Sequence, residues 1–294
     1  MRKTLKELNL LDDFLFGTLL TYPELGEKFS RALLQTIFQR EFGKLTVIPQ
    51  KIYYGSDTDQ HGARLDVYME EEDAARVSSV YDVEPDQPHG RLNKETAPRR
   101  LRFYHALIDS QCLKSGESYL ALKNVIVIMI TSYDLFGRDR MVYTIQNRCV
   151  EEPDLPYDDG AKTIYLYTKG TRGNPSRALQ EFLHYIEETT WENAVNPTLQ
   201  SIQQMVDVVK SDKEVSLGYM KIFEREEMLI NMGREEERAR TEQERLRADQ
   251  EQFRADQEQI RADQEQIRAD QEHLRAEQAE EKVRQLEALL KEKN

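Results

Sequence analysis

The chain has 294 residues, a formal net charge of −13 and 32% charged residues, which excludes a histone-like protein coated in positive charge. Its longest uninterrupted apolar run, residues 125–130, has six residues, whereas a membrane-spanning helix needs roughly 20, so we expect no membrane partner. The two cysteines, Cys112 and Cys149, lack CxxC spacing. We therefore expect no disulfide framework or structural zinc site, and a cytoplasmic location.

The composition changes near Gly233. Residues 234–294 hold 13 Lys/Arg and 18 Asp/Glu, and their apolar residues are too sparse for a core. The other 28 basic and 36 acidic residues give residues 1–233 a net charge of −8, in a segment long enough to bury one substantial core. We predict a globular domain over residues 1–233 with a helical C-terminal part, and a charged heptad-repeat segment over 234–294.

Hydrophobic periodicity predicts a mixed α/β domain. Its expected elements, in chain order, are helices at 5–20 and 23–42, strands at 47–54, 64–69 and 77–84, a helix at 99–114, strands at 125–131, 141–146 and 163–168, and helices at 175–189, 198–210 and from about 215 into the tail. The run 125–131 is continuously apolar or β-branched, which is typical of a strand covered on both faces.

The tail after Leu246 repeats with a period of seven, as RADQEQF, RADQEQI, RADQEQI and RADQEHL. Its apolar residues form one stripe: Leu246, Phe253, Ile260, Ile267 and Leu274. If the stripe occupies heptad position d, position a holds glutamine throughout, which makes a weak seam. The tail is therefore either a long solvated helix that self-associates weakly into a homo-oligomer or a repeat that is merely helical and soluble.

Two acids fall in neighbouring predicted strands. Asp66 lies within Arg-Leu-Asp-Val-Tyr and Glu84 ends Val-Tyr-Asp-Val-Glu, with a turn predicted over 70–76. Consecutive strands joined by a turn are expected to pair in antiparallel fashion, so the two carboxylates can meet. Such a pair is electrostatically costly unless a divalent cation binds. Hard oxygen ligands indicate Mg²⁺ or Mn²⁺, which polarises phosphate and generates hydroxide for attack on a phosphodiester. The alternative is that both acids are solvent-facing strand residues.

An ordered set of motifs carries a resemblance to a known family. The motifs are LDDFLFGTL (11–19), RLDVYM (64–69), VYDVEPDQ (80–87), PRRLRFYHALIDSQCLKSGESYLAL (98–122), VIVIMITSYDLFG (125–137) and YDDGAKTIYLY (157–167). As a set, over roughly residues 5–230, they resemble the bacterial PD-(D/E)xK nuclease family of transposase-related proteins, kin of the recombination-promoting nucleases. The resemblance implies an α/β restriction-endonuclease-like core, a mixed central sheet flanked by helices, followed in this chain by the long C-terminal helix or coiled coil. It also implies Mg²⁺-dependent cleavage of DNA.

The resemblance assigns roles to individual acids. Asp66 matches the first acid of the family signature, and Glu84 matches the acid of its (D/E)xK half, so these two are the implied metal ligands. Asp13, in the first predicted helix, matches an extra acid that some members of the superfamily carry there.

The signature departs from the family at the position two residues after Glu84. Asp86, followed by Gln87, stands where the superfamily has lysine and close relatives often have glutamine. An aspartate cannot stabilise negative charge as lysine does, although it can serve as a third metal ligand or a base, and the neighbouring helix can supply a cation. Pro85 lacks a strand hydrogen-bond donor, so we expect the ladder to break or bulge after Glu84.

A local basic patch offers a site for phosphates. Between residues 89 and 105, five basic residues face a single acid, Glu95: Arg91, Lys94, Arg99, Arg100 and Arg102. Three arginines at the start of a helix can contact successive phosphates of DNA, helped by free backbone N–H groups. The alternative is a solvated helix face that pairs with acids elsewhere. No base-reading module is visible, so we expect weak sequence preference.

Two functions from different classes therefore remain. The first is a Mg²⁺-dependent DNA endonuclease with Asp66, Glu84 and Asp86 at its centre and Arg99, Arg100 and Arg102 on the DNA backbone, whose nicks or breaks promote recombination. The second is a nonenzymatic nucleic-acid-binding or oligomeric scaffold protein that keeps the nuclease fold and has lost turnover at Asp86.

Overall fold

The computed structural model describes residues 3–49, 51–53, 63–73, 76–86, 93–113 and 115–292. The chain divides into two compact units, Met1–Lys221 and Ile222–Asn294. The first unit contains every strand of the described residues, and the second consists of helix.

The strands of the first unit form a mixed sheet. They are β1 (Lys44–Pro49), β2 (Ile52–Tyr53), β3 (Ala63–Arg64), β4 (Val67–Asp73), β5 (Arg76–Asp86), β6 (Asn124–Thr131), β7 (Val142–Ile145) and β8 (Ala161–Tyr167). In the described residues, six of them make one sheet in the order β1-β4-β5-β6-β8-β7, and β2 pairs with β3. The central strands β5, β6 and β8 run parallel, whereas β1, β4 and β7 are antiparallel to their neighbours.

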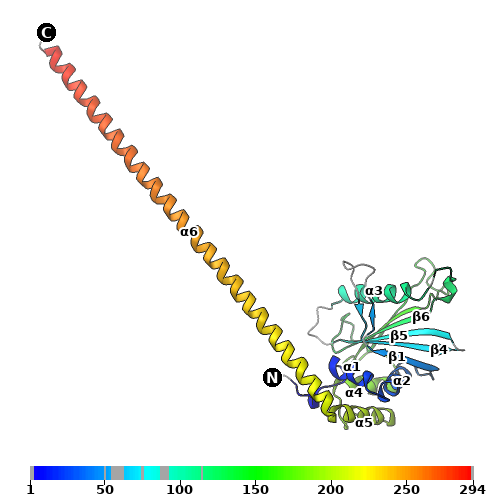
Figure 1. Ribbon diagram of the computed structural model, residues 1–294. Helices are drawn as coiled ribbons and strands as arrows, with labels where there is room; N and C mark the ends of the chain where they lie inside the picture. The colour runs from blue at the N-terminus through cyan, green and yellow to red at the C-terminus, as the bar shows by residue number, and fades with distance from the viewer. Residues whose placement is uncertain are drawn as a thin grey trace. The chain divides into compact units, whose positions relative to one another are not determined.

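The helices of the described residues are η1 (Leu5–Glu7), α1 (Asp13–Thr21), α2 (Leu25–Phe38), α3 (Thr96–Ser110), η2 (Tyr119–Ala121), α4 (Arg177–Glu187), α5 (Pro197–Ser211) and α6 (Lys213–Glu292). Five of them cover the two faces of the six-stranded sheet. Helices α1, α2, α4 and α5 pack on one face and α3 on the other (Figure 1). The prediction of an α/β domain with a mixed sheet flanked by helices and a long C-terminal helix is confirmed.

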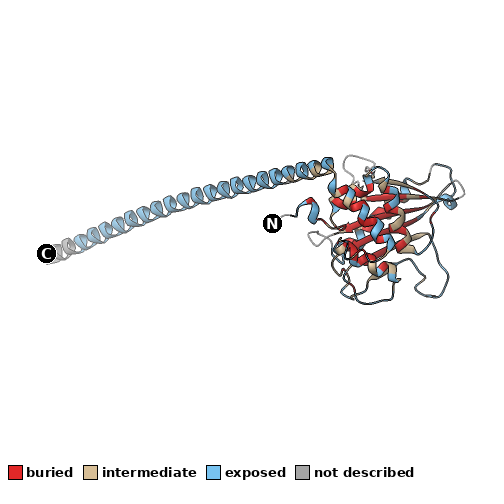
Figure 2. Ribbon diagram, turned by 90° about the horizontal axis from the view of Figure 1, so that it is seen from below, coloured by how far each residue is buried: buried red, intermediate tan, exposed pale blue. Residues whose placement is uncertain are grey.

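The burial of the strands follows their side-chain alternation. Strand β6, predicted to be covered on both faces, has all residues buried from Val125 to Thr131. Figure 2 shows that buried residues gather in the interior of the first unit. In β5, Tyr81 and Val83 belong to the core under α1 and α2, while Val80 belongs to the core under α3. Successive residues of a strand point to opposite faces of the sheet. Asp82 and Glu84 alternate with Tyr81 and Val83, so both carboxylates lie on the face that α3 covers.

Several boundaries differ from the sequence prediction. The helix predicted over 23–42 ends at Phe38, and the described part of the strand predicted over 47–54 falls in two strands, β1 and β2. The helix predicted over 5–20 is interrupted between η1 and α1, because the Asn9 side chain bonds the backbone of Glu187 and Thr189 instead of lying on a helix surface. Strand β4 continues to Asp73, so the predicted turn over 70–76 is shorter. Asp66 lies at a bend between β3 and β4, not inside a strand.

The expected break after Glu84 occurs on one side of β5 only. Strand β5 pairs with β6 without a register shift through Pro85 and Asp86, so the prediction of a broken ladder is wrong for that edge. On the other edge, pairing with β4 ends at Asp82. Proline is therefore tolerated because no β4 residue pairs with it.

The tail is one helix, α6, and its stripe of apolar residues from Leu246 to Leu274 is exposed. Among the described residues, no helix is both long enough and apolar enough to cross a bilayer.

The chain at Gly26 in α2 lies so close to the end of α1 that a side chain there would clash. A Cβ built on Gly26 would lie 2.0 Å from the carbonyl oxygen of Leu20, whereas a Cβ on Gly218 in α6 meets nothing within 4 Å. We expect Gly26→Ala to destabilise the domain by about 2–3 kcal/mol, as overpacking does, and Gly218→Ala to be neutral or stabilising by up to about 1 kcal/mol. Urea unfolding followed by the fluorescence of Trp191, the single tryptophan, tests this; equal effects of both substitutions would contradict it.

Candidate active site

The structure brings the two predicted acids, Asp66 and Glu84, together. The backbone N–H of Asp66 donates a 2.9 Å hydrogen bond to Oε1 of Glu84. The bend that holds Asp66 is fixed by its neighbours, because Leu65 and Val67 on either side are fully buried. Glu84 comes from β5 and is 1% exposed. The expected meeting of neighbouring strands β4 and β5 is therefore observed, with antiparallel pairing.

A third acid, Asp82, lies on the same face of β5. It is fully buried; no N–H or hydroxyl group among the described residues donates a hydrogen bond to its carboxylate oxygens, which lie within hydrogen-bonding reach of the carboxyl of Glu84. The charges of Glu84 and Asp66 both act on it. Sequence reasoning passed over Asp82, although its place two residues before Glu84 in a strand puts both side chains on one face.

A half-buried cation, Arg100, joins this group from helix α3. Its Nη2 donates a 2.9 Å hydrogen bond to Oε2 of Glu84, and its Nε donates to the Tyr104 hydroxyl. The helix presents Arg100 to the sheet because Ala97 and Tyr104, three and four residues away, are on the buried side of α3. Arg100 was predicted to bind DNA phosphate; in the structure it pairs with Glu84.

Asp86 and Asp13 lie at the edge of the cluster. The hydroxyl of Tyr133 donates a hydrogen bond to Oδ2 of Asp86. Asp13 is the first residue of α1, and burial, followed by the charge of Asp86, raises the pKa of its carboxyl, while Arg100 lowers it. Five acids thus share one electrostatic environment with Arg100: Asp13, Asp66, Asp82, Glu84 and Asp86.

Burial dominates the titration of the two innermost acids. Desolvation and then the charge of Asp66 raise the pKa of Glu84 to about 8, against the lowering effects of the Asp66 N–H and Arg100. Desolvation and the charges of Glu84 and Asp66 raise the pKa of Asp82 well above its ordinary value. Because shifted carboxyls gather at functional sites, this cluster is the candidate site.

The other basic residues have different surroundings. Lys94, Arg99 and Arg102 are exposed on or beside α3, while Arg91, like Gln87, falls outside the described residues. Arg99 and Arg102 flank Arg100 in sequence but do not share its side of the helix. Of the three predicted DNA-binding arginines, two therefore remain open to solvent.

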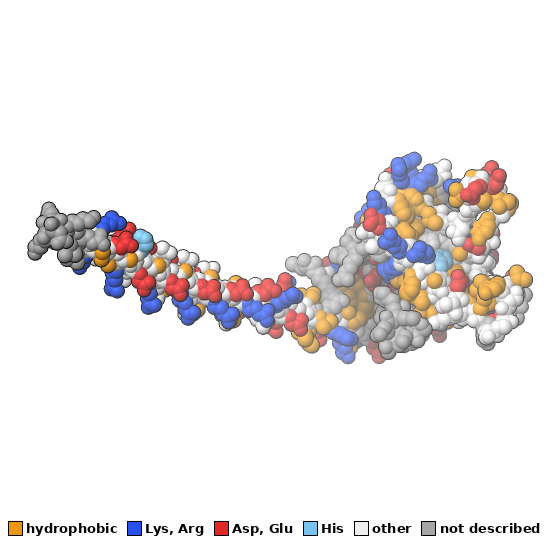
Figure 3. All heavy atoms as spheres, turned by 90° about the horizontal axis from the view of Figure 1, so that it is seen from above, with side chains coloured by type: hydrophobic (Ala, Val, Ile, Leu, Met, Phe, Trp, Pro, Cys, Tyr) orange, Lys and Arg blue, Asp and Glu red, His pale blue; other side chains and the backbone are white. Residues whose placement is uncertain are grey.

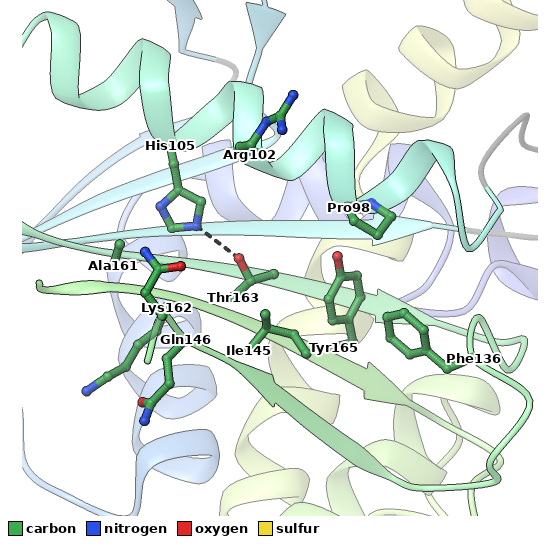
Figure 4. Close-up of a pocket in the computed structure, with 11 residues that line it drawn as sticks. Pro98, Arg102, His105, Phe136, Ile145, Gln146, Ala161, Lys162, Thr163 and Tyr165 are labelled. Atoms are coloured by element: carbon green, nitrogen blue, oxygen red, sulfur yellow. Dashed lines mark hydrogen bonds between the residues drawn. The ribbon is translucent and has the colours of Figure 1, made fainter. Parts of the chain in front are cut away.

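Arg102 lines a separate pocket of about 330 Å³ between α3 and the strands β7 and β8 (Figure 4). In this pocket Nε2 of His105 is 3.0 Å from Oγ1 of Thr163, and the rings of Phe136 and Tyr165 meet edge to face at 5.0 Å. None of the five clustered acids lines the pocket. The acid cluster and this pocket are therefore distinct.

The family resemblance implies Mg²⁺, and the donor atoms that this ion prefers can be compared with those of the cluster. Within the described ranges, no group of three or more His, Cys, Asp or Glu side chains is spaced to hold a metal ion. Carboxylates are nevertheless the donors that Mg²⁺ prefers, and no N–H or hydroxyl group in this part of the chain donates to the oxygens of Asp82. Both oxygens of Glu84 already accept hydrogen bonds, so Mg²⁺ would compete with Arg100. The residues fit the ion by donor type.

Comparison of the chain with protein-family models, with curated proteins and with solved structures finds no match.

Proposed function

We propose that this protein is a Mg²⁺-dependent DNA endonuclease with a restriction-endonuclease-like core and little sequence specificity. The observation that carries the proposal is the junction of Asp66, Glu84 and Arg100, formed by three separate elements. One acid from the bend before β4, one acid from β5 and a cation from the following helix match, in chemical type, what phosphodiester hydrolysis requires: ligands for a metal and positive charge for the transition state.

Each residue of the cluster would have a separate role in the reaction. Asp66 and Glu84 would hold Mg²⁺ or Mn²⁺ through carboxylate oxygens. When bound, the ion would polarise a phosphate oxygen and acidify a water molecule. Asp86, whose carboxylate is positioned by Tyr133, would accept a proton from the attacking water. Arg100 would hold Glu84 in place and offset the negative charge that builds up on the phosphate.

The exposed arginines of α3 would position the DNA backbone. Arg99 and Arg102 are exposed near the start of a helix whose first turn contains no acid, where the helix dipole also favours phosphate. The backbone N–H groups of Thr96 and Ala97 bond Asn93, so the arginine side chains would supply the contacts. Contacts of this kind carry no base information, which is the basis for expecting weak sequence preference and strong salt dependence.

One observation favours a second function, a catalytically impaired DNA-binding or scaffold protein. Arg100 occupies Oε2 of Glu84, and Asp86 adds negative charge at the position where the family signature has lysine. If Mg²⁺ does not displace Arg100, the cluster is a structural ion pair that keeps the nuclease fold without turnover.

Cleavage of supercoiled plasmid tests the proposal. We expect the wild type to nick plasmid with Mg²⁺ or Mn²⁺ and to lose activity in EDTA, and Asp66→Ala and Glu84→Ala each to lower the rate more than about 100-fold, because both remove a metal ligand. Glu72→Ala is the matched control, since Glu72 is a β4 acid paired with Lys44 outside the cluster, and should cleave as the wild type does. Equal traces in all four proteins would indicate contamination and refute the enzyme; DNA binding without cleavage would support the second function.

A further inference from the structure

The second unit carries an exposed apolar row. The five apolar side chains of the repeat, one per heptad, are 54–64% exposed: Leu246, Phe253, Ile260, Ile267 and Leu274. They lie on one continuous helix, α6. A row of this kind repeated every seven residues is the pattern by which helices pair in coiled coils.

Charged residues flank this row with opposite signs on its two sides. With the apolar residues at position d, position e holds arginine in every heptad: Arg240, Arg247, Arg254, Arg261, Arg268 and Arg275. Position g holds an acid in every heptad: Glu242, Asp249, Asp256, Asp263, Asp270 and Glu277. Figure 3 shows acidic and basic side chains running along this unit in separate lengthwise rows. The surface is therefore polarised across the row.

This polarity distinguishes the two orientations in which a second copy could pack. In a parallel, in-register pair, position g of one helix faces position e of the next heptad in the other, so Asp249 meets Arg254 of a second copy, and so on along the repeat. In an antiparallel pair, e faces e and g faces g, which sets arginine against arginine and aspartate against aspartate. Only the parallel pair therefore sets opposite charges against each other.

The seam also limits the number of helices. Position a holds glutamine, for example Gln250 and Gln257, whose amide is costly to enclose without partners. In a two-stranded seam such an amide keeps contact with water at the edge, whereas three or four strands would enclose it. Isoleucine at d, as at Ile260 and Ile267, favours more strands when a is apolar, but in this repeat the polar a position opposes them.

We propose that residues 240–277 form a parallel, in-register, two-stranded coiled coil with a second copy of this chain. Because the two helices are parallel and in register, the residues that precede the repeat lie at the same end of the coiled coil in both copies. This interaction requires neither metal nor DNA, and it therefore stands or fails independently of the nuclease proposal.

Sedimentation equilibrium of the full-length protein tests the association. We expect dimers, and we expect the double variant Ile260→Asp/Ile267→Asp to raise the dimer dissociation constant more than about 100-fold, because two charges would enter the seam. The matched control places the same residue on the outer face at heptad position f, in Ala255→Asp/Ala262→Asp, and should dimerise as the wild type does. Monomers at all concentrations, trimers or larger assemblies, or a dimer that survives the seam substitutions would each overturn the proposal.

A charge-exchanged chain tests the orientation. Arg247, Arg254, Arg261 and Arg268 become glutamate, and Asp249, Asp256, Asp263 and Asp270 become lysine. We expect this chain to dimerise with itself and not with the wild type, because a parallel mixed pair sets like charges together. Exchange between differently tagged chains, followed by co-purification, measures this. If the exchanged chain dimerises readily with the wild type, the helices are antiparallel and the proposal is overturned.

Discussion

The metal-free protein should lose stability as the pH rises from about 5 to about 8, and Glu84→Gln should remove much of that loss. Burial and the charge of Asp66 raise the pKa of Glu84 from 4.5 to about 8. Between these values the folded protein keeps a proton that the unfolded chain has released, so the contribution of Glu84 is fully present below its unfolded pKa and disappears through its folded pKa. The slope is about 1.4 kcal/mol per pH unit, a total of up to about 5 kcal/mol.

Urea unfolding in EDTA at several pH values, followed by Trp191 fluorescence, measures this dependence. The glutamine variant should show a flatter profile, with part of the slope retained because the pKa of Asp82 is raised in the same direction. Glu152→Gln, in an exposed loop, is the matched control and should keep the wild-type profile. Parallel profiles for wild type and Glu84→Gln would mean that Glu84 is ionised in the folded protein, and that burial does not control the titration of the cluster.

The central strand and one strand pairing followed from the sequence because they depend on local patterns. The apolar run 125–131 predicted the central strand, and the short interval between the strands predicted at 64–69 and 77–84 predicted their antiparallel pairing. The order of the strands in the sheet and the parallel pairings of β6 were not predicted. The interruption between η1 and α1 did not follow, because it depends on Asn9 bonding backbone groups some 180 residues away. Periodicity within a window of ten residues contains no information about such a contact.

The sequence predicted two central acids of the candidate site, Asp66 and Glu84, but neither the third buried acid, Asp82, nor the partner of Arg100. Asp66 and Glu84 were found because they fall in or beside neighbouring predicted strands. Whether Arg99, Arg100 or Arg102 faces the sheet depends on the rotation of α3, since neighbouring helical residues differ by about 100° in direction. The spacing of Arg100 from Ala97 and Tyr104 contains the answer, but only once those two residues are known to be buried.

The net charge of the chain is the sum of two different charge arrangements, one in residues 1–221 and one in the tail. Some of the acidity of residues 1–221 is concentrated at one buried cluster, where it costs stability unless a cation is present. The acidity of the tail alternates with arginine at fixed heptad positions, where it would direct the proposed pairing. A single total of −13 conceals both arrangements.

Arg100→Gln should lower the cleavage rate at pH 7 by about 10²–10³-fold, the loss that follows removal of one group stabilising transition-state charge. The fold should survive, because Glu84 can take up a proton when its cation is gone. The charge of Arg100 lowers the pKa of Glu84, so its removal leaves a smaller fraction of Glu84 ionised and able to bind metal. Arg100→Lys should be intermediate, since lysine keeps the charge but lacks the two separate nitrogens that reach Glu84 and Tyr104.

The pH–rate profile separates the two ways in which Arg100 can act. If it acts through Glu84, the rising limb of the Arg100→Gln profile moves to higher pH and much of the rate returns at pH 9. If it acts on the phosphate directly, the loss is the same at every pH. The contacts of Arg100 with Glu84 and Tyr104 favour the first result, which makes Arg100 a positioning residue. Arg99→Gln, at the exposed neighbouring position, should raise KM and leave kcat and the profile unchanged; a profile for Arg100→Gln that matches this control would refute a role for Arg100 in the site.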